Sequence, residues 1–219
     1  MSGATGDRAT ILARVREALG GARAPVDAIR AEAAALVPDP AAVRPAFDTQ
    51  AVLGHFLLKA TSEKVTATAE RVADAAALPA AVRRYLDAAG LEPSVAVALP
   101  DEFLALDWQG FVLKDAIDRN EPVALTFAEA GIAETGTLVF PSSPTVPTLF
   151  NFLALHHLVV LRAADVVPYM EDVWRRFDGT ALPRSLNLVT GTSGTADIEG
   201  KNVRGAHGPR FMRIFVLEG

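Results

Sequence analysis

Polar residues crowd the stretch from residue 190 to residue 199, TGTSGTADIE, which follows the apolar run SLNLV. Thr190, Gly191, Thr192, Ser193 and Thr195 place hydroxyls and unhindered backbone N–H groups where a strand is expected to lead into a short helix. Such groups at a helix N-terminus bind phosphate or carboxylate. The spacing matches neither a P-loop nor the dinucleotide fingerprint G-x-G-x-x-G. The stretch therefore predicts an anion site but does not identify its ligand.

The alternative for this stretch is purely structural. Thr195 would cap the short helix, while Asp197 and Glu199 would pair with local N–H groups or with Arg204. A basic segment follows directly, because residues 200–213 contain four Lys and Arg residues and no acidic one, although the chain as a whole has a formal net charge of −5. Lys201 and Arg204 are the candidates to neutralise a bound anion. The acidic balance argues against nonspecific nucleic-acid binding.

A second polar cluster, AETGTL, occupies residues 133–138 between two apolar runs. Glu134 is expected at a strand end, where partial burial would raise its pKa and suit it to act as a base or nucleophile. The alternative is that Glu134 accepts hydrogen bonds from turn N–H groups and that Gly136 supplies an unusual φ. Thr135 and Thr137 flank this glycine with hydroxyls.

The histidines and cysteines bear on metals and cofactors. His207 lies between glycines in GAHGP, where the backbone can approach a ligand closely, and it is the second candidate proton carrier. No two histidines have the i, i+4 spacing of a helical zinc site, so no metal is predicted. The chain has no cysteine, which excludes disulfides and any cluster or cofactor held on its own thiolates. The identity of a cofactor stays open.

Targeting signals are not evident in the sequence. No run of about 18 apolar residues suggests a membrane span, and the N-terminus lacks the apolar core of a signal peptide. We therefore expect a cytoplasmic protein with no membrane span, which the lack of cysteine also fits.

The elements that must position these residues follow from hydrophobic periodicity. Helices are predicted over residues 8–19, 51–60, 78–89 and 166–177, and strands over 64–69, 94–99, 156–162, 185–191 and 213–218, with two or three strand pieces within 122–140. Residues 22–50 are rich in alanine and proline and suggest an extended arm. We predict an N-terminal helical arm over residues 1–60 and an α/β domain over residues 61–219.

Apolar strands that alternate with helices indicate an α/β fold with a mainly parallel sheet covered on both faces. Ligands of such folds bind beyond the carboxyl ends of the strands, which is where the 190–199 stretch is expected to lie.

Three blocks of this sequence resemble those of the LUD-domain family and, more narrowly, its lactate-utilisation C branch. They read GIAETGTLVF, PTLFNFLALHHLVVLRAADVV and NLVTGTSGTADIEGKNVRGAHGP, and they keep the family's order over residues 131–209. The resemblance implies a three-layer α/β/α fold similar to the ribose-5-phosphate isomerase, CoA-transferase and 5-formyltetrahydrofolate cyclo-ligase group. It also implies a role in oxidising L-lactate to pyruvate beside two partner proteins that carry the iron–sulfur clusters.

The resemblance also implies a set of ligand-site positions. The residues that match the blocks are Glu134, Thr135, Gly136, Thr137, Asn151, His157, Thr190, Gly191, Ser193, Thr195, Asp197, Glu199, His207, Gly208 and Pro209. Two positions depart from the family pattern. Gly194 stands where relatives usually carry an arginine, and Ala154-Leu155-His156 replaces a proline–acid–threonine step.

The function hypothesis follows from both lines of reasoning. The chain would bind a small carboxylate or a phosphate-bearing ligand at the loops between Thr190 and His207, as the cluster-free component of a lactate-oxidising system. One alternative is a stand-alone CoA-transferase-like or ATP-dependent ligase-like enzyme. In it, either Glu134 forms an acyl intermediate with CoA or the loop binds the phosphates of a nucleotide. Another is a non-catalytic adaptor whose arm and basic segment dock partner proteins.

Overall fold

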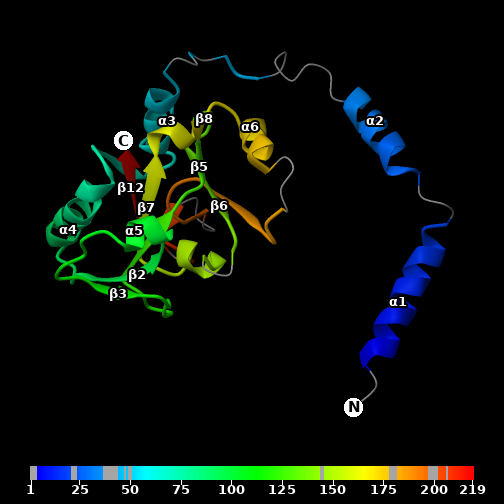
Figure 1. The fold of residues 1–219 in the computed structure, drawn as a ribbon, viewed down its shortest axis with the longest axis horizontal. Coiled ribbons are helices and arrows are strands. Elements are labelled where there is room, and N and C mark those ends of the chain that lie inside the picture. Colours follow the sequence, from blue (N-terminus) through cyan, green and yellow to red (C-terminus); the bar gives the residue numbers. More distant parts are fainter. Residues whose placement is uncertain are drawn as a thin grey trace. The chain divides into compact units, whose positions relative to one another are not determined.

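The structure is a computed structural model that describes residues 4–20, 24–36, 44–46, 48, 51–143, 146–177, 182–196, 202–205 and 207–219. The chain divides into two units, Met1–Pro45 and Ala46–Gly219 (Figure 1). The candidate site belongs to the second unit.

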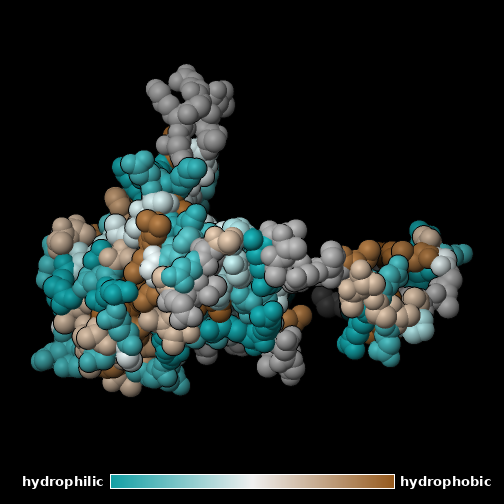
Figure 2. Space-filling model, turned by 90° about the horizontal axis from the view of Figure 1, so that it is seen from above, coloured by the Kyte–Doolittle hydropathy of each residue, from teal (hydrophilic) through white to brown (hydrophobic). Residues whose placement is uncertain are grey.

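Two helices, α1 (Ala4–Ala18) and α2 (Val26–Leu36), make up the described secondary structure of the first unit. The helix predicted for residues 8–19 is confirmed by α1. The extended arm predicted for residues 22–50 is wrong in its first half, because the alanine-rich run there forms α2, in keeping with the high helix propensity of alanine. Ile11, Val15 and Leu19 remain exposed, and Figure 2 shows hydrophobic surface on these helices.

A six-stranded parallel sheet forms the centre of the second unit. Its strand order is β1-β12-β7-β4-β2-β3, and every neighbouring pair is parallel. The strands are β1 (Thr68–Val72), β2 (Ser94–Ala98), β3 (Val112–Lys114), β4 (Val123–Phe127), β7 (His156–Arg162) and β12 (Phe211–Leu217).

The two faces of this sheet pack against different elements. On β7, Leu158 and Val160 join a core with α4 (Leu78–Ala89) and α5 (Asp101–Leu104). The alternate residues Val159 and Leu161 face a second core that contains α3 (Val52–Ala60). Alternation along the strand thus sends apolar side chains to both faces, as the continuous apolar runs of the sequence predicted. The predicted α/β class with a mainly parallel, doubly covered sheet is confirmed.

A smaller sheet shares the α3 face of the large sheet. Its order is β8-β5-β6-β9, with β5 (Ala130–Ile132), β6 (Thr137–Pro141), β8 (Val166–Val167) and β9 (Leu186–Val189). Leu138 and Phe140 of β6 pack in the same core as Phe56 of α3. A separate antiparallel ladder joins β10 (Gly194–Ala196) to β11 (Asn202–Arg204).

The second unit starts upstream of residue 61, where the sequence placed the beginning of the α/β domain. Helix α3 lies within it, and the side chains of Phe56 and Ala60 are fully buried. Burial of an aromatic ring of this size stabilises a domain by about 3 kcal/mol or more. Helix α3 is therefore part of the packed core of this unit.

Several element boundaries differ from the sequence-based prediction. The strand expected over 64–69 begins at Thr68, after Thr66 adopts a positive φ of 67°. The helix expected over 166–177 is shorter, because the chain first forms β8 and then α6 (Met170–Trp174) and a 3-10 turn. The helix predicted after the 190–193 loop is wrong for residues 194–196, because these pair with β11. Helix α4 ends as predicted at Gly90, whose φ is 66°.

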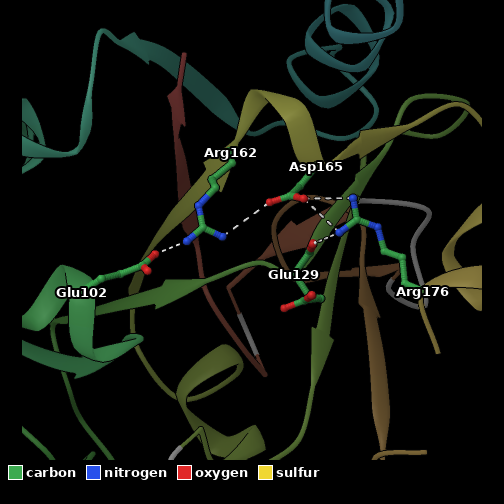
Figure 3. A network of polar contacts seen from close by, with 5 residues as sticks. All are labelled: Glu102, Glu129, Arg162, Asp165 and Arg176. Atoms are coloured by element: carbon green, nitrogen blue, oxygen red, sulfur yellow. Dashed lines mark hydrogen bonds and ion pairs between the residues drawn. The ribbon is translucent and has the colours of Figure 1, made fainter. Parts of the chain in front are cut away.

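Ionic contacts cross the carboxyl end of the parallel sheet (Figure 3). Arg162, the last residue of β7, contacts Glu102 of α5 and lies 3.7 Å from Asp165. Asp165 in turn accepts two hydrogen bonds of 3.0 Å from Arg176, which also donates to the carbonyl oxygen of Glu129 at 2.9 Å. The network ties α5, β7 and the segment after α6 together at the edge where the sequence argument expected the ligand loops.

Candidate functional site

The predicted ligand loops meet at the opposite edge, beside the amino ends of β1, β7 and β12. A cavity of about 240 Å³ opens there. Its lining includes eight of the predicted residues, namely Asn151, Thr190, Gly191, Thr192, Ser193, His207, Gly208 and Pro209. We call it the signature cavity. The expected position beyond the carboxyl ends is wrong, because Thr190 follows β9 of the small sheet and not a strand of the parallel sheet.

Backbone contacts hold the loop of residues 191–193 at this place. The N–H of Thr192 donates to the carbonyl oxygen of Val65 at 3.2 Å, and the N–H of Ser193 donates to that of Pro209 at 2.9 Å. Gly191 has a φ of 74°, and a Cβ there would lie 1.7 Å from the Val65 oxygen. Only glycine permits this approach. Gly191 therefore has a structural reason to be glycine, whatever the cavity binds.

Threonine hydroxyls connect the first and third sequence blocks. Thr137 lies 2.7 Å from the Thr135 hydroxyl and 2.6 Å from the Thr190 hydroxyl. The pairing of β6 with β9 brings these strands together, with Leu138 opposite Val189. Thr137 is buried and does not line the cavity, so it positions Thr190 through a hydrogen bond.

Asn151 is the most deeply buried polar side chain of the signature cavity. It ends the 3-10 helix η4 (Thr148–Asn151), and only 1% of its surface is exposed. Its Oδ1 atom has no hydrogen-bond partner among the residues that the structure describes. A buried acceptor in this condition costs about 1–3 kcal/mol, and that cost is removed when a donor binds to it. The amide thus fits a ligand that carries a hydroxyl or an N–H group.

Glu134 and Gly136 lie in the turn between β5 and β6. The N–H of Glu134 donates to the carbonyl oxygen of Pro168 at 3.0 Å, and the side chain is half-buried and not part of the signature cavity. Gly136 has a φ of 72°, and a Cβ there would lie 2.5 Å from the Ala60 nitrogen. The conformational role proposed for Gly136 is confirmed.

His157 is enclosed in the core. It is fully buried, its Nε2 atom lies 2.8 Å from the Thr126 hydroxyl, and Nδ1 has no partner. Burial lowers the pKa of His157 to about 3, so the ring is neutral at physiological pH. The ring also lies 5.6 Å from that of Phe140 and does not line the signature cavity.

A larger groove of about 870 Å³ lies at the amino ends of β1 and β12. Its lining includes Thr66, Thr68, Tyr85, Arg204, Arg210 and Phe211, and we call it the arginine groove. The Thr66 hydroxyl lies 2.5 Å from that of Thr192, so one hydrogen bond connects this groove to the signature cavity. Sequence reasoning singled out Arg204 but missed Tyr85 and Thr66, which lie more than 100 residues away along the chain.

The β10–β11 ladder positions Arg204. Thr195 pairs with Val203, and Gly194 lies directly opposite Arg204. Directly opposite residues share one face of an antiparallel ladder. A side chain at position 194 would therefore project on the same side as Arg204.

Asp197, Glu199 and Lys201 lie outside the described residues. Within the described part of the chain, no group of three or more His, Asp or Glu side chains is placed to hold a metal ion. Nor does that part contain a helix that is both long and apolar enough to cross a membrane.

Comparison with known proteins matches the same region of the chain. The model of the LUD domain family matches residues 119–217. Lactate utilization protein C of Bacillus licheniformis is 31% identical over 119 residues, covering 51% of this chain and 50% of that protein. Lactate utilization protein C of Bacillus subtilis strain 168 is 35% identical over 102 residues, covering 44% and 42%. The chain spans about half the length of the curated relatives it matches.

The fold also has a solved counterpart. The crystal structure of a DUF162 family protein from Deinococcus radiodurans superposes with a TM-score of 0.56 at 19% identity, covering 79% of this chain and all of that one. At this identity the likeness supports the fold alone. Asn151 and the 190–208 loops all lie within residues 119–217.

Proposed function

We propose that the protein, whose residues 119–217 match the model of the LUD domain family, is a component of a bacterial system that oxidises L-lactate to pyruvate. Within it, the signature cavity binds the small 2-hydroxy carboxylate. The names of the relatives from two Bacillus species support the process. The lining and the volume of the cavity support the identity of the ligand.

The observation that carries the proposal is the convergence on one cavity of residues more than 35 positions apart. Asn151 comes from one sequence block, and Thr190, Ser193 and His207 come from another. Their side chains offer an amide, two hydroxyls and an imidazole. A volume of about 240 Å³ suits a three-carbon acid better than a nucleotide.

Lactate has one group for each kind of partner in the cavity. Its hydroxyl donates to the Oδ1 atom of Asn151, which has no other partner. Its carboxylate accepts hydrogen bonds from the hydroxyls of Thr192 and Ser193. His207, which is exposed at this cavity, is placed to exchange a proton with solvent. The role of this chain is therefore to bind and orient the acid.

Electron transfer falls to other subunits in this proposal. The chain has no cysteine and so cannot hold an iron–sulfur cluster on thiolates of its own. Partner proteins that carry clusters would accept the two electrons released when the hydroxy acid becomes a keto acid.

The CoA-transferase-like alternative has weaker support. It requires Glu134 as the reacting carboxylate, and Glu134 is absent from the lining of the signature cavity. The adaptor alternative does not explain why the Oδ1 atom of Asn151 is buried without a hydrogen-bond partner.

Growth on L-lactate tests the proposal. The chain is expressed in Bacillus subtilis strain 168 whose own lactate utilization protein C has been deleted. We expect the chain to restore growth on L-lactate, and Asn151→Leu, which keeps the side-chain volume but removes the amide, to abolish that growth. Asn120→Leu, at an exposed asparagine outside the signature cavity, should behave like the parent. Full growth with Asn151→Leu, or none with the folded parent chain, would contradict the proposal.

A further inference from the structure

The arginine groove has a positive wall that nothing in the described structure neutralises. Arg204 and Arg210 line it, and neither lies within ion-pair distance of a described carboxylate. None of its lining residues is acidic. The chain has a formal net charge of −5, so a groove lined by two such arginines and no acidic residue is a local exception.

The backbone brings the residue after Arg204 against Arg210. Gly205, directly after Arg204, has a φ of 76°, and a Cβ there would lie 2.5 Å from the Cβ of Arg210. Its N–H also donates to the carbonyl oxygen of Ser193 at 2.9 Å. Two guanidinium groups that line one groove give it a positive potential, which favours a bound anion.

Other arginines nearby are already neutralised. Arg84 and Arg213 contact the two carboxylate oxygens of Glu70 at 2.6 and 2.5 Å. This contrast separates arginines that pair with a carboxylate from Arg204 and from Arg210, whose guanidinium lies 5.6 Å from the centre of the Phe211 ring. The cationic wall of the groove consists of the second pair.

The rest of the wall is uncharged and combines hydroxyl groups with apolar side chains. The Tyr85 hydroxyl lies 2.8 Å from the Nδ1 atom of His156, whose ring stacks on Phe211 at 4.5 Å. Burial raises the pKa of Tyr85 and lowers that of His156, so both groups stay neutral near pH 7. Hydroxyls of Thr66 and Thr68 complete this side. No negative charge on this wall opposes an anion.

We infer that the arginine groove binds the phosphoryl group of an organic phosphate. A phosphoryl group has three acceptor oxygens and a charge of about −2, whereas a monocarboxylate has two oxygens and a single charge. A groove with two arginines and no acidic residue therefore favours phosphate over a monocarboxylate. A volume of about 870 Å³ accommodates a nucleotide-sized molecule and far exceeds a three-carbon acid. The site is separate from the signature cavity, and the hydrogen bond between Thr66 and Thr192 makes the two neighbours.

Calorimetric titration of the full chain with ADP, pyrophosphate and inorganic phosphate tests this inference at low ionic strength. We expect ADP or pyrophosphate to bind, and Arg204→Ala and Arg210→Ala each to weaken that binding at least tenfold, because each removes a charge-assisted contact. Arg71→Ala removes an exposed arginine at the carboxyl end of β1 and should change the affinity less than twofold. All three side chains are exposed, and unchanged thermal unfolding verifies the fold of each variant.

Comparison of the affinities for these ligands identifies the source of the phosphoryl group. Tighter binding of ADP than of pyrophosphate identifies a nucleotide, and equal binding identifies a phosphoryl group without a base. Absence of binding by ADP and pyrophosphate at millimolar concentration would overturn the inference, as would binding that survives both arginine substitutions. Asn151→Leu should leave phosphate binding intact, so failure of the lactate proposal and failure of this one give different results.

Discussion

Asn151 and His157 are two buried polar residues of the same sequence block, and the structure gives them different roles. Each has one side-chain atom without a partner, Oδ1 in Asn151 and Nδ1 in His157. Asn151 lines the signature cavity, whereas His157 lies between Thr126 and Phe140 inside the core. The sequence alone marked both as ligand residues, because matching a block does not reveal which way a strand turns each side chain.

Because His157 is buried in its neutral form, the free energy of unfolding should fall as the pH is lowered. Its pKa is about 3 in the folded chain and near 6.5 when unfolded, so only the unfolded state takes up a proton as the pH falls below about 6.5. The folded state should lose about 1.4 kcal/mol for each pH unit below that point, until the pH nears 3.

Urea unfolding of the parent chain and of His157→Gln between pH 7 and pH 5 measures this effect. The variant cannot titrate at this position, so its free energy of unfolding should fall less steeply with pH. Burial lowers the pKa of His156 as well, and the slope that remains in the variant includes that residue. Identical slopes for the two proteins would show that His157 is not held neutral.

At the scale of elements, the strands of the core follow from the sequence and the ligand loops do not. The run HHLVVLR predicts β7, because it is apolar, β-branched and short. The sequence predicts a short helix after the 190–193 loop, yet Thr195 pairs with Val203 in a ladder. Short ladders of this kind depend on a cross-strand partner, which local propensity does not report.

The contacts of the ionic network at the carboxyl end of the sheet should contribute unequally to the free energy of unfolding. Arg176 is three-quarters buried and donates to both Asp165 and the Glu129 carbonyl, whereas the side chains of Glu102 and Arg162 are 57% and 41% exposed. We expect Arg176→Ala to lower the free energy of unfolding by about 1–3 kcal/mol. Glu102→Ala should cost less than about 1 kcal/mol, because water screens an exposed pair. Urea denaturation of both variants measures the difference, and equal costs would refute this ranking.

At the scale of the molecule, the fold class was predictable and the location of the site was not. Alternating helices and apolar strands indicate a parallel sheet whatever the details. Ligands of such sheets usually bind beyond the carboxyl ends of the strands, and this rule predicts the wrong edge for the loops. Strand β9 belongs to the second sheet, and the loop that follows it lies beside Val65 and Pro209. Sheet membership is a long-range property, and a short strand such as Leu186–Val189 does not encode it locally.

Removal of N-terminal segments tests where the folded domain begins. A chain that starts at Ala46 retains α3 and should unfold cooperatively within about 3 °C of the full chain, since it loses no residue of the second unit. A chain that starts at residue 61 loses Phe56 and Ala60 from the core. We expect it to be destabilised by about 3 kcal/mol or more. Calorimetry compares the three chains, and equal stability of the two truncated ones would place the boundary at residue 60.

The most direct test of the central claim is a ¹H–¹⁵N NMR titration of the full chain with L-lactate, with propionate as the ligand that lacks the hydroxyl. The account predicts saturable shifts of the Asn151 side-chain amide and of the Ser193 and Gly208 backbone signals, with propionate at least about tenfold weaker because the Asn151 acceptor stays unpaired. Equal affinity for both acids, or lactate shifts confined to residues outside the signature cavity, would contradict it.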